Sequence, residues 1–286
     1  MLDAKILKKG VLTLFLGAIA IVFLFPIVIT FTNSLMTEQE ISINYGSIGQ
    51  MNQAARFVNL KLLPDQVTLE QYRKVLVDSP RYLAMFWNSV FMVVPIIAGH
   101  TLVASLAAYA FSKLKFRGRE SLFLVYVLTM LMPFQVTLVP NYIMADRLGL
   151  LNSPIAILLP GIFAAFGVFM LRQFMLEIPY DYIEAGKMDG AGHLRIFFEI
   201  MLPMVKPGLA ALVLLLFVDY WNMVEQPIVF LDDPFKQPLS VYLSRINAEP
   251  GVAFAASVIY MAPMVLLFLH AEAYFIEGIQ LSGIKG

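Results

Sequence analysis

The sequence predicts an all-α membrane protein with six transmembrane helices and one polar segment between two of them. Of the 286 residues, 59% are hydrophobic and only 14% are charged, whereas soluble domains carry about 25% charged residues. The mean hydropathy is +0.77. Apolar runs of about 20 residues, enough to cross a bilayer as a helix, recur along the chain. These features place the chain in a lipid bilayer rather than in solution.

Five of the six apolar runs contain no charged residue, and the other is interrupted by Asp219 and Glu225. The first run follows Lys5, Lys8 and Lys9, but it is too long for a signal peptide and is not closed by a small-residue cleavage site, so we expect a retained helix. In chain order the runs are 11–32, 82–112, 121–145, 148–171, 207–231 and 250–271.

The distribution of Lys and Arg predicts the orientation in the membrane. Twelve of the 20 lie at the N-terminus, in the segments 112–120 and 172–206, or at the C-terminus, while five of the other eight lie in one long loop. Basic residues favour the cytoplasmic side, and long loops count less. We therefore expect a multi-pass protein of a prokaryotic plasma membrane with both termini in the cytoplasm. The predicted parts are a first helix (1–32), an outer loop (33–81) and a five-helix core (82–286).

Composition and motifs exclude several classes of protein. The net charge is zero, so nothing indicates a nucleic-acid partner. The absence of cysteine excludes disulfides and thiolate chemistry. The sequence contains no GxxxxGK[ST] phosphate-binding loop and no GxSxG or HExxH motif. We therefore expect no catalytic, cofactor or metal site in this chain.

The segment 181–203 is polar although apolar runs flank it on both sides, so it should face water. Asp181 and Glu184 have the spacing of a capping box, which predicts a helix starting near Tyr182. Gly190 is suited to a left-handed turn at the end of that helix. A second helix is predicted from about residue 191 to Pro203, where it should end.

The spacing within this segment resembles the EAA loop of permease subunits in binding-protein-dependent ABC importers. Glu184-Ala185-Gly186 is followed after three residues by Gly190 and after nine more by Ile200-Met201-Leu202-Pro203, with Gly186 replacing the usual second alanine. The resemblance implies the type I permease fold, in which this loop is a coupling helix on an ATPase subunit. The residues it assigns to ATPase coupling are Glu184, Ala185, Gly186, Asp189, Gly190 and Arg195. Glu184 would make the polar contact, while Asp189 and Arg195 would orient the loop.

Other stretches, from about residue 65 to 286, resemble the smaller permease of maltose-type carbohydrate importers. They are Asn88-Ser89, the run 107–119 (AYAFSKLKFRGR preceded by Ala107), Met132–Gln135, Leu148–Asn152, Trp221-Asn222 and Gly278 to Gly286. The resemblance implies a permease subunit that forms half of a sugar or oligosaccharide pathway by alternating access. It implies four partners besides the lipid bilayer: a second homologous permease, two ATPase subunits that bind the ATP, and an extracytoplasmic solute-binding protein.

Polar residues within the apolar runs are candidates for the translocation pathway. Asp219, Asn222 and Glu225 recur every three residues, which predicts one polar face of one helix, and Trp221 lies between them. Gln135 and Thr137 lie between Pro133 and Pro140, where prolines free backbone carbonyls. Carboxylates, amides and aromatic rings suit sugar hydroxyl groups. The alternatives are contacts between helices or a position near the outer interface for the first set, and a simple proline kink for the second.

Three alternative functions are less consistent with the sequence. A permease for glycerol-phosphate-type polyols would share the motifs, but no arginine lies inside the apolar runs to hold a phosphate. An ion-coupled secondary transporter is usually longer and has inverted repeats, which we do not find. An intramembrane enzyme would need a catalytic motif.

His100, inside the second run, is expected to be a packed, hydrogen-bonded residue rather than a proton relay.

Overall fold

The computed structural model describes residues 2–45, 60–245 and 250–283, with side chains described from residue 8 to residue 272 within these ranges. Every regular element in these ranges is helical, as the predicted all-α class requires. The chain divides into two compact units, one comprising residues 1–83 and 245–262, the other residues 84–244 and 263–286. The predicted division at residues 32 and 81 concerns membrane topology and remains a prediction. Residues 46–59 of the expected outer loop and 284–286 of the C-terminal motif lie outside the described residues.

The first unit is built around the end of its first helix. Its elements are α1 (Leu2–Asn33), α2 (Glu38–Tyr45), α3 (Glu70–Arg73), the π-helical segment η1 (Lys74–Asp78) and the beginning of α15 (Pro250–Gly283). Met36, Ile41 and Tyr45 are buried together and pack against Phe254. Tyr82 donates a hydrogen bond to the carbonyl of Ala256 over 2.9 Å. The predicted outer loop therefore contains short helices.

Ion pairs support the chain between α2 and α3. Lys61 pairs with the carboxylates of Glu40 and Asp65. Their hydrogen bonds raise the pKa of Lys61, with Asp65 making the largest contribution. The side chain of Lys74 pairs with Glu38 at 2.5 Å, joining η1 to α2. Apart from Glu40, which is 8% exposed, the partners are accessible to solvent, so these pairs orient the segments rather than hold the unit together.

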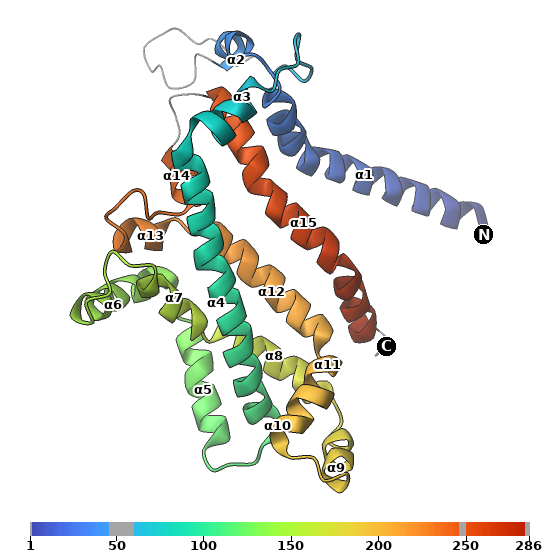
Figure 1. Ribbon diagram of the computed structural model, residues 1–286. Helices are drawn as coiled ribbons and strands as arrows, with labels where there is room; N and C mark the ends of the chain where they lie inside the picture. The colour runs from blue at the N-terminus through green and yellow to red at the C-terminus, as the bar shows by residue number, and fades with distance from the viewer. Residues whose placement is uncertain (1, 46–59, 246–249, 284–286) are drawn as a thin grey trace. The chain divides into compact units, whose positions relative to one another are not determined.

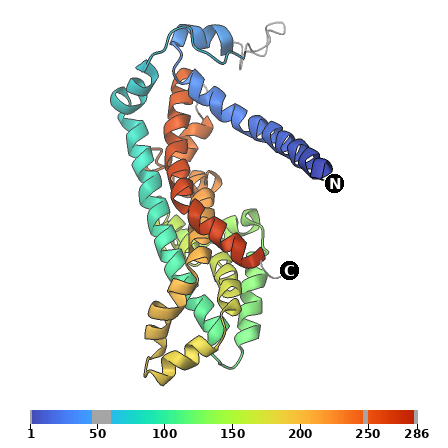
Figure 2. The same ribbon diagram turned by 90° about the vertical axis from the view of Figure 1, so that its right-hand side faces the viewer.

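The second unit contains the remaining elements, and α4 runs along it in both views (Figures 1 and 2). The elements are α4 (Pro80–Lys113), α5 (Arg119–Met130), α6 (Phe134–Arg147), α7 (Ile155–Ile162), α8 (Phe166–Glu177), α9 (Asp181–Met188), α10 (His193–Ile196), η2 (Phe197–Met201), α11 (Leu202–Met204), α12 (Lys206–Trp221), α13 (Glu225–Phe230) and α14 (Leu239–Arg245).

Two hydrophobic clusters hold these elements together. One joins α4, α8, α9, η2 and α12 through Ala108, Leu171, Ile183, Phe197 and Leu212, each at most 1% exposed. The other joins α4, α7 and α13 and includes Met92, Ile96, Ile157 and Phe230. The long helix α4 thus contributes to both clusters.

The described helices include four that are long and apolar enough to cross a membrane without a break. They are Lys8–Asn33, Pro80–Lys113, Ile155–Glu177 and Pro250–Glu272. Two further spans form only if bent pairs of helices are counted: α5 with α6, bent by 101°, and residues His193–Met204 with α12, bent by 77°. The number of spans is therefore between four and the predicted six.

The run 121–145, which we expected to form one span, is divided into two helices. The chain leaves the helix after Met130 and starts α6 at Phe134, with Pro133 extended before it (ψ 140°). The residue before a proline disfavours helical geometry, and proline itself removes a backbone donor, so Met132-Pro133 breaks the helix.

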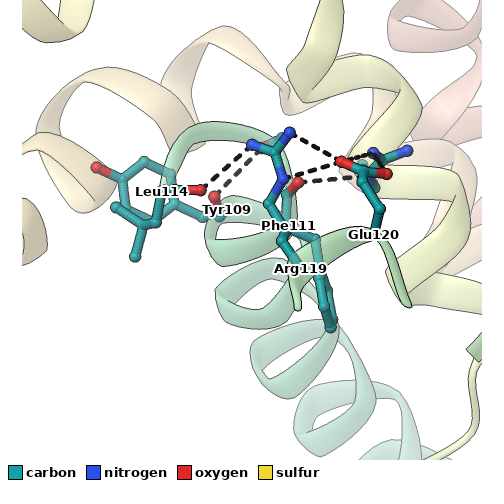
Figure 3. A network of polar contacts seen from close by, with 7 residues as sticks. Tyr109, Phe111, Leu114, Arg119 and Glu120 are labelled. Carbon is teal, nitrogen blue, oxygen red and sulfur yellow. Dashed lines mark hydrogen bonds and ion pairs between the residues drawn. The ribbon is translucent and has the colours of Figure 1, made fainter. Parts of the chain in front are cut away.

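Charged side chains fix the turn between α4 and α5, as Figure 3 shows for Arg119, Glu120 and Leu114. Glu120 pairs with Arg119 at 2.8 Å and with Arg172 of α8 at 3.1 Å. Arg119 also donates to the carbonyl of Leu114 over 3.3 Å. The turn itself requires Gly118, whose φ of +84° is a left-handed value that residues with a Cβ disfavour. This network ties the ends of α4, α5 and α8 together.

A glycine allows α8 to approach α4 closely. A Cβ atom at Gly167 would lie 2.2 Å from Nε2 of His100 and 2.9 Å from Cβ of Ala104. His100 is fully buried and Ala104 is 1% exposed, so neither can move into open space.

We expect Gly167→Ala to lower the thermal stability of the full chain in mild detergent, because over-packing a tight core costs about 1–3 kcal/mol. Gly17→Ala in α1 is the control, since a Cβ there meets nothing within 4 Å. The unfolding temperature should fall for Gly167→Ala and stay unchanged for Gly17→Ala. Equal unfolding temperatures would contradict the close approach of α8 to α4.

Candidate functional site

A cavity of about 720 Å³ lies within the second unit, where the ends of several helices meet. It is lined by α6, α7, α12, α13 and the turn between the last two. The lining residues are Phe134, Gln135, Thr137, Asn141, Pro160, Gly161, Ala164, Val218, Asp219, Tyr220, Asn222, Met223, Val224, Glu225 and Gln226. We call this cavity the polar pocket. Five of the six residues predicted for the pathway line it.

The three polar residues at the end of α12 do not share one helix, so this part of the prediction is wrong. The helix ends at Trp221, Asn222 occupies its C-cap, and Glu225 begins α13. The amide of Asn222 donates to the carbonyl of Val218 over 2.7 Å, and its backbone N–H donates to the same carbonyl. The break nevertheless leaves Asp219, Asn222 and Glu225 on the pocket wall.

Gln135 and Thr137 reach the pocket from the first turn of α6. The side-chain amide of Gln135 donates to the carboxylate of Glu225 over 3.4 Å, across 90 residues of sequence. The hydroxyl of Thr137 donates to the carbonyl of Phe134 over 2.9 Å, within its own helix. The bend at Pro133 therefore presents the start of α6 to the end of α12.

Trp221 does not line the pocket, unlike its neighbours in sequence. It is 2% exposed and stacks on Phe217, with ring centroids 5.0 Å apart. Its other aromatic neighbour is Phe86 of α4, at 5.8 Å. The position of Trp221 is that of a core residue that packs α12 on α4.

Sequence reasoning missed several lining residues. Asn141 lies one helical turn after Thr137, a spacing that could have identified it. Gln226 follows Glu225 and could have been found by extending the polar stretch. Gly161 and Ala164 carry no polar side chain, so only their contacts in the folded chain reveal them.

Helix α4 packs against α7, which forms part of the pocket wall. Nδ1 of His100 lies 2.8 Å from the carbonyl oxygen of Gly161, and His100 is fully buried, which confirms the expected packed and hydrogen-bonded histidine. The hydroxyl of Tyr220 donates to the same carbonyl over 3.5 Å. A Cβ at Gly161 would lie 2.9 Å from Ile96, so α7 sits close against α4 at this point.

The predicted coupling segment is a short helix followed by a glycine turn. Helix α9 runs from Asp181 to Met188, and Gly190 has φ +78°, the left-handed value that the sequence predicts. The predicted capping box is wrong, because Asp181 is already inside the helix. Tyr180 precedes the helix and its carbonyl, instead of a side chain, accepts from the N–H groups of Ile183 and Glu184.

The second helix of this segment begins at His193 rather than 191, and Pro203 does not end it. The π-helical turn η2 leads into α11, where proline occupies one of the first two positions, a place that tolerates it. The helical segment ends at Met204.

Helix α9 has one buried and one exposed face. Ile183 and Gly186 are buried, and a Cβ at Gly186 would lie 3.0 Å from Ile200 and 3.1 Å from Ile196. Glu184, Ala185 and Asp189 are exposed. Gly186 therefore packs within the chain, while the exposed face is open to contact.

Apolar side chains are exposed around this turn as well. Met188 is 88% exposed and Leu194 is 69% exposed. Arg195, which the sequence predicts to orient the loop, pairs with Glu199 one turn along at 2.8 Å. The exposed apolar side chains suit docking to another protein.

The two sites offer binding surfaces rather than reaction chemistry. The polar pocket presents carboxylate, amide and hydroxyl groups, and the coupling segment presents a short exposed helix. Among the described residues, no group of three or more histidine and acidic side chains could hold a metal ion.

Comparison with known proteins identifies a family. Residues 77–276 match the family described as "Binding-protein-dependent transport system inner membrane component". The arabinooligosaccharides transport system permease protein AraQ of Halalkalibacterium halodurans is 33% identical over 227 residues, which cover 78% of this chain and 81% of that protein. The sn-glycerol-3-phosphate transport system permease protein UgpE of Brucella abortus is 26% identical over 282 residues, 94% of each chain.

A solved structure has the same fold. A chain of a bacterial ABC transporter involved in the import of the acidic polysaccharide alginate matches with a TM-score of 0.79 and 26% identity, covering 95% of this chain and 98% of that one. The matched family covers more than half of the sequence, and the fold is shared over almost its whole length. This chain therefore belongs to the family of binding-protein-dependent transport system inner membrane components, the permease subunits of ABC importers.

Proposed function

We propose that this chain forms half of the translocation pathway for a sugar or oligosaccharide, and that ATP hydrolysis on separate subunits drives it by alternating access. The observation that carries the proposal is the exposed face of α9, where Glu184 and Ala185 are open to contact on a short helix between apolar segments. In the sequence, this helix has the spacing of an EAA coupling loop.

The proposed partners follow from what the chain contains and lacks. The sequence has no phosphate-binding loop, so two ATPase subunits would bind the ATP and each would receive a coupling helix. Closure of the ATPases would move the permease helices as nearly rigid bodies. A second permease would complete the pathway, and an extracytoplasmic solute-binding protein would deliver the cargo. The distribution of Lys and Arg, with 12 of the 20 at the termini and in the segments 112–120 and 172–206, favours a cytoplasmic position for this segment and for both termini.

A carbohydrate cargo is supported by the relatives and by the polar pocket. Permeases for arabinooligosaccharides and lactose are among the similar proteins. The residues that line the pocket include two carboxylates and no lysine, arginine or histidine. Carboxylates and amides bind hydroxyl groups, whereas a phosphate needs cationic donors. This favours a neutral saccharide over a polyol phosphate, the cargo named for the permease of Brucella abortus.

The ATPase contact is tested by reversing one charge. Glu184→Lys should leave the chain in the membrane but reduce the ATPase recovered with the purified complex by about tenfold or more, because a like or unpaired charge in an interface costs several kcal/mol. Asp232→Lys, an exposed acidic residue far from α9 in the sequence, is the matched control. Equal recovery of the ATPase with both variants would refute the proposed role of Glu184.

The cargo is tested by competition and by one neutralised carboxylate. Neutral oligosaccharides should inhibit uptake and glycerol phosphate should not. Asp219→Asn should raise the KM for the neutral cargo about tenfold, the scale of one charge-assisted hydrogen bond. Asp146→Asn, on α6 but outside the pocket lining, should leave the KM unchanged. Strong inhibition by glycerol phosphate would instead support the polyol-phosphate alternative.

A further inference from the structure

The coupling segment is attached to the end of α4 on both sides of α9. Before α9, the ammonium group of Lys113 donates to the carbonyl of Ile178 over 2.5 Å. After α9, the hydroxyl of Tyr109 lies 3.2 Å from Nδ1 of His193, and its ring lies 5.4 Å from that of Phe197. Figure 1 shows α9 and α10 beside this end of α4. Any displacement of α9 must therefore move α4 or break these contacts.

Tyr180 extends the first of these attachments. Its ring lies between two cations, Lys115 after α4 at 5.9 Å and Lys187 of α9 at 5.7 Å, distances within the range of cation–π attraction. The carbonyl of Tyr180 also accepts the first hydrogen bonds of α9. The residue before α9 therefore contacts Lys187 of α9 itself and Lys115, which follows α4.

Fold stability alone does not explain the buried ammonium group of Lys113. It is only 6% exposed, and none of the ion pairs among the described side chains includes it. Burying an ammonium group without a carboxylate is costly, and an apolar side chain would pack more cheaply. Its hydrogen bond to the turn before α9 is therefore better explained by a positioning role, in which Lys113 fixes that turn relative to α4.

The same helix touches the polar pocket and the opposite end of the unit. His100 of α4 holds the carbonyl of Gly161 in the pocket wall at 2.8 Å. Further along, Asn88 donates to the carbonyl of Phe235 over 2.6 Å, and the hydroxyl of Ser89 accepts from the N–H of Leu239 over 2.9 Å. One helix, Pro80–Lys113, carries all these contacts.

We infer that α4 transmits the displacement of the coupling helix to the polar pocket, and that Lys113 and Tyr109 are the positioning residues that attach it. This inference rests on the proposed function. It assigns a role to the AYAFSKLKFRGR stretch, none of whose residues lines the pocket.

The natural absence of cysteine allows a direct test in the assembled transporter. Thr137→Cys gives this chain one thiol, in the pocket wall, and the rate at which this chain reacts with a maleimide is measured without nucleotide and with ATP trapped, after separating it from its partners. In this background, Lys113→Met should abolish most of the ATP-dependent change in rate, while the ATPase still co-purifies and hydrolyses ATP. Lys113→Arg, which keeps a cationic donor, should restore the change.

Two further variants separate attachment from general damage. Tyr109→Phe removes only the hydroxyl contact with His193 and should reduce the ATP-dependent change by severalfold without loss of assembly. Lys206→Met removes an exposed lysine at the start of α12 and should leave the change intact.

Each outcome decides between the two proposals. If Thr137→Cys alone shows no response to ATP, the alternating-access function fails and the inference fails with it. If Thr137→Cys responds and the response survives both Lys113→Met and Tyr109→Phe, the proposed function stands and α4 is not its transmitter. If both variants lose the ATPase itself, these residues serve assembly, and the inference is again overturned.

Discussion

The hydrocarbon core of a bilayer offers no hydrogen-bond partner, and this constraint determines where the helices of this chain break. The breaks after α5, after α7 and after α12 gather around the polar pocket, where side chains add hydrogen bonds to backbone carbonyls near the helix ends. Asn222 caps the carbonyl of Val218, and His100 binds the carbonyl of Gly161. At these three breaks the irregular backbone lines a cavity, and the same breaks bring polar side chains to its wall.

Much of this architecture could be predicted from sequence because it depends on local chemistry. Apolar runs, the left-handed Gly190 and the buried His100 follow from residue type and neighbours. The bend of 101° between α5 and α6 and the break between Asp219 and Glu225 were not predicted. The spacing of three residues between Asp219, Asn222 and Glu225 is equally compatible with one continuous helix. What brings Gln135 to Glu225 is packing between segments 90 residues apart, which periodicity does not encode.

The chain separates the tasks of a transporter among distinct surfaces. The exposed face of α9 suits a protein partner, the pocket suits a hydroxylated cargo, and α4 contacts the regions that carry both. Gly186, where related loops usually have alanine, packs against Ile196 and Ile200 rather than facing outward. The departure from the family pattern therefore affects the internal fit of the coupling segment, while Glu184 and Ala185 remain exposed.

The most direct test of this account is reconstitution of the complex, purified from its native membrane with its companions, into liposomes. The account predicts uptake of a saccharide that requires ATP on the ATPase side together with the loaded solute-binding protein, and no uptake from an ion gradient alone. Uptake by this chain alone, driven by an ion gradient without ATP, would contradict it and would make the chain a secondary transporter.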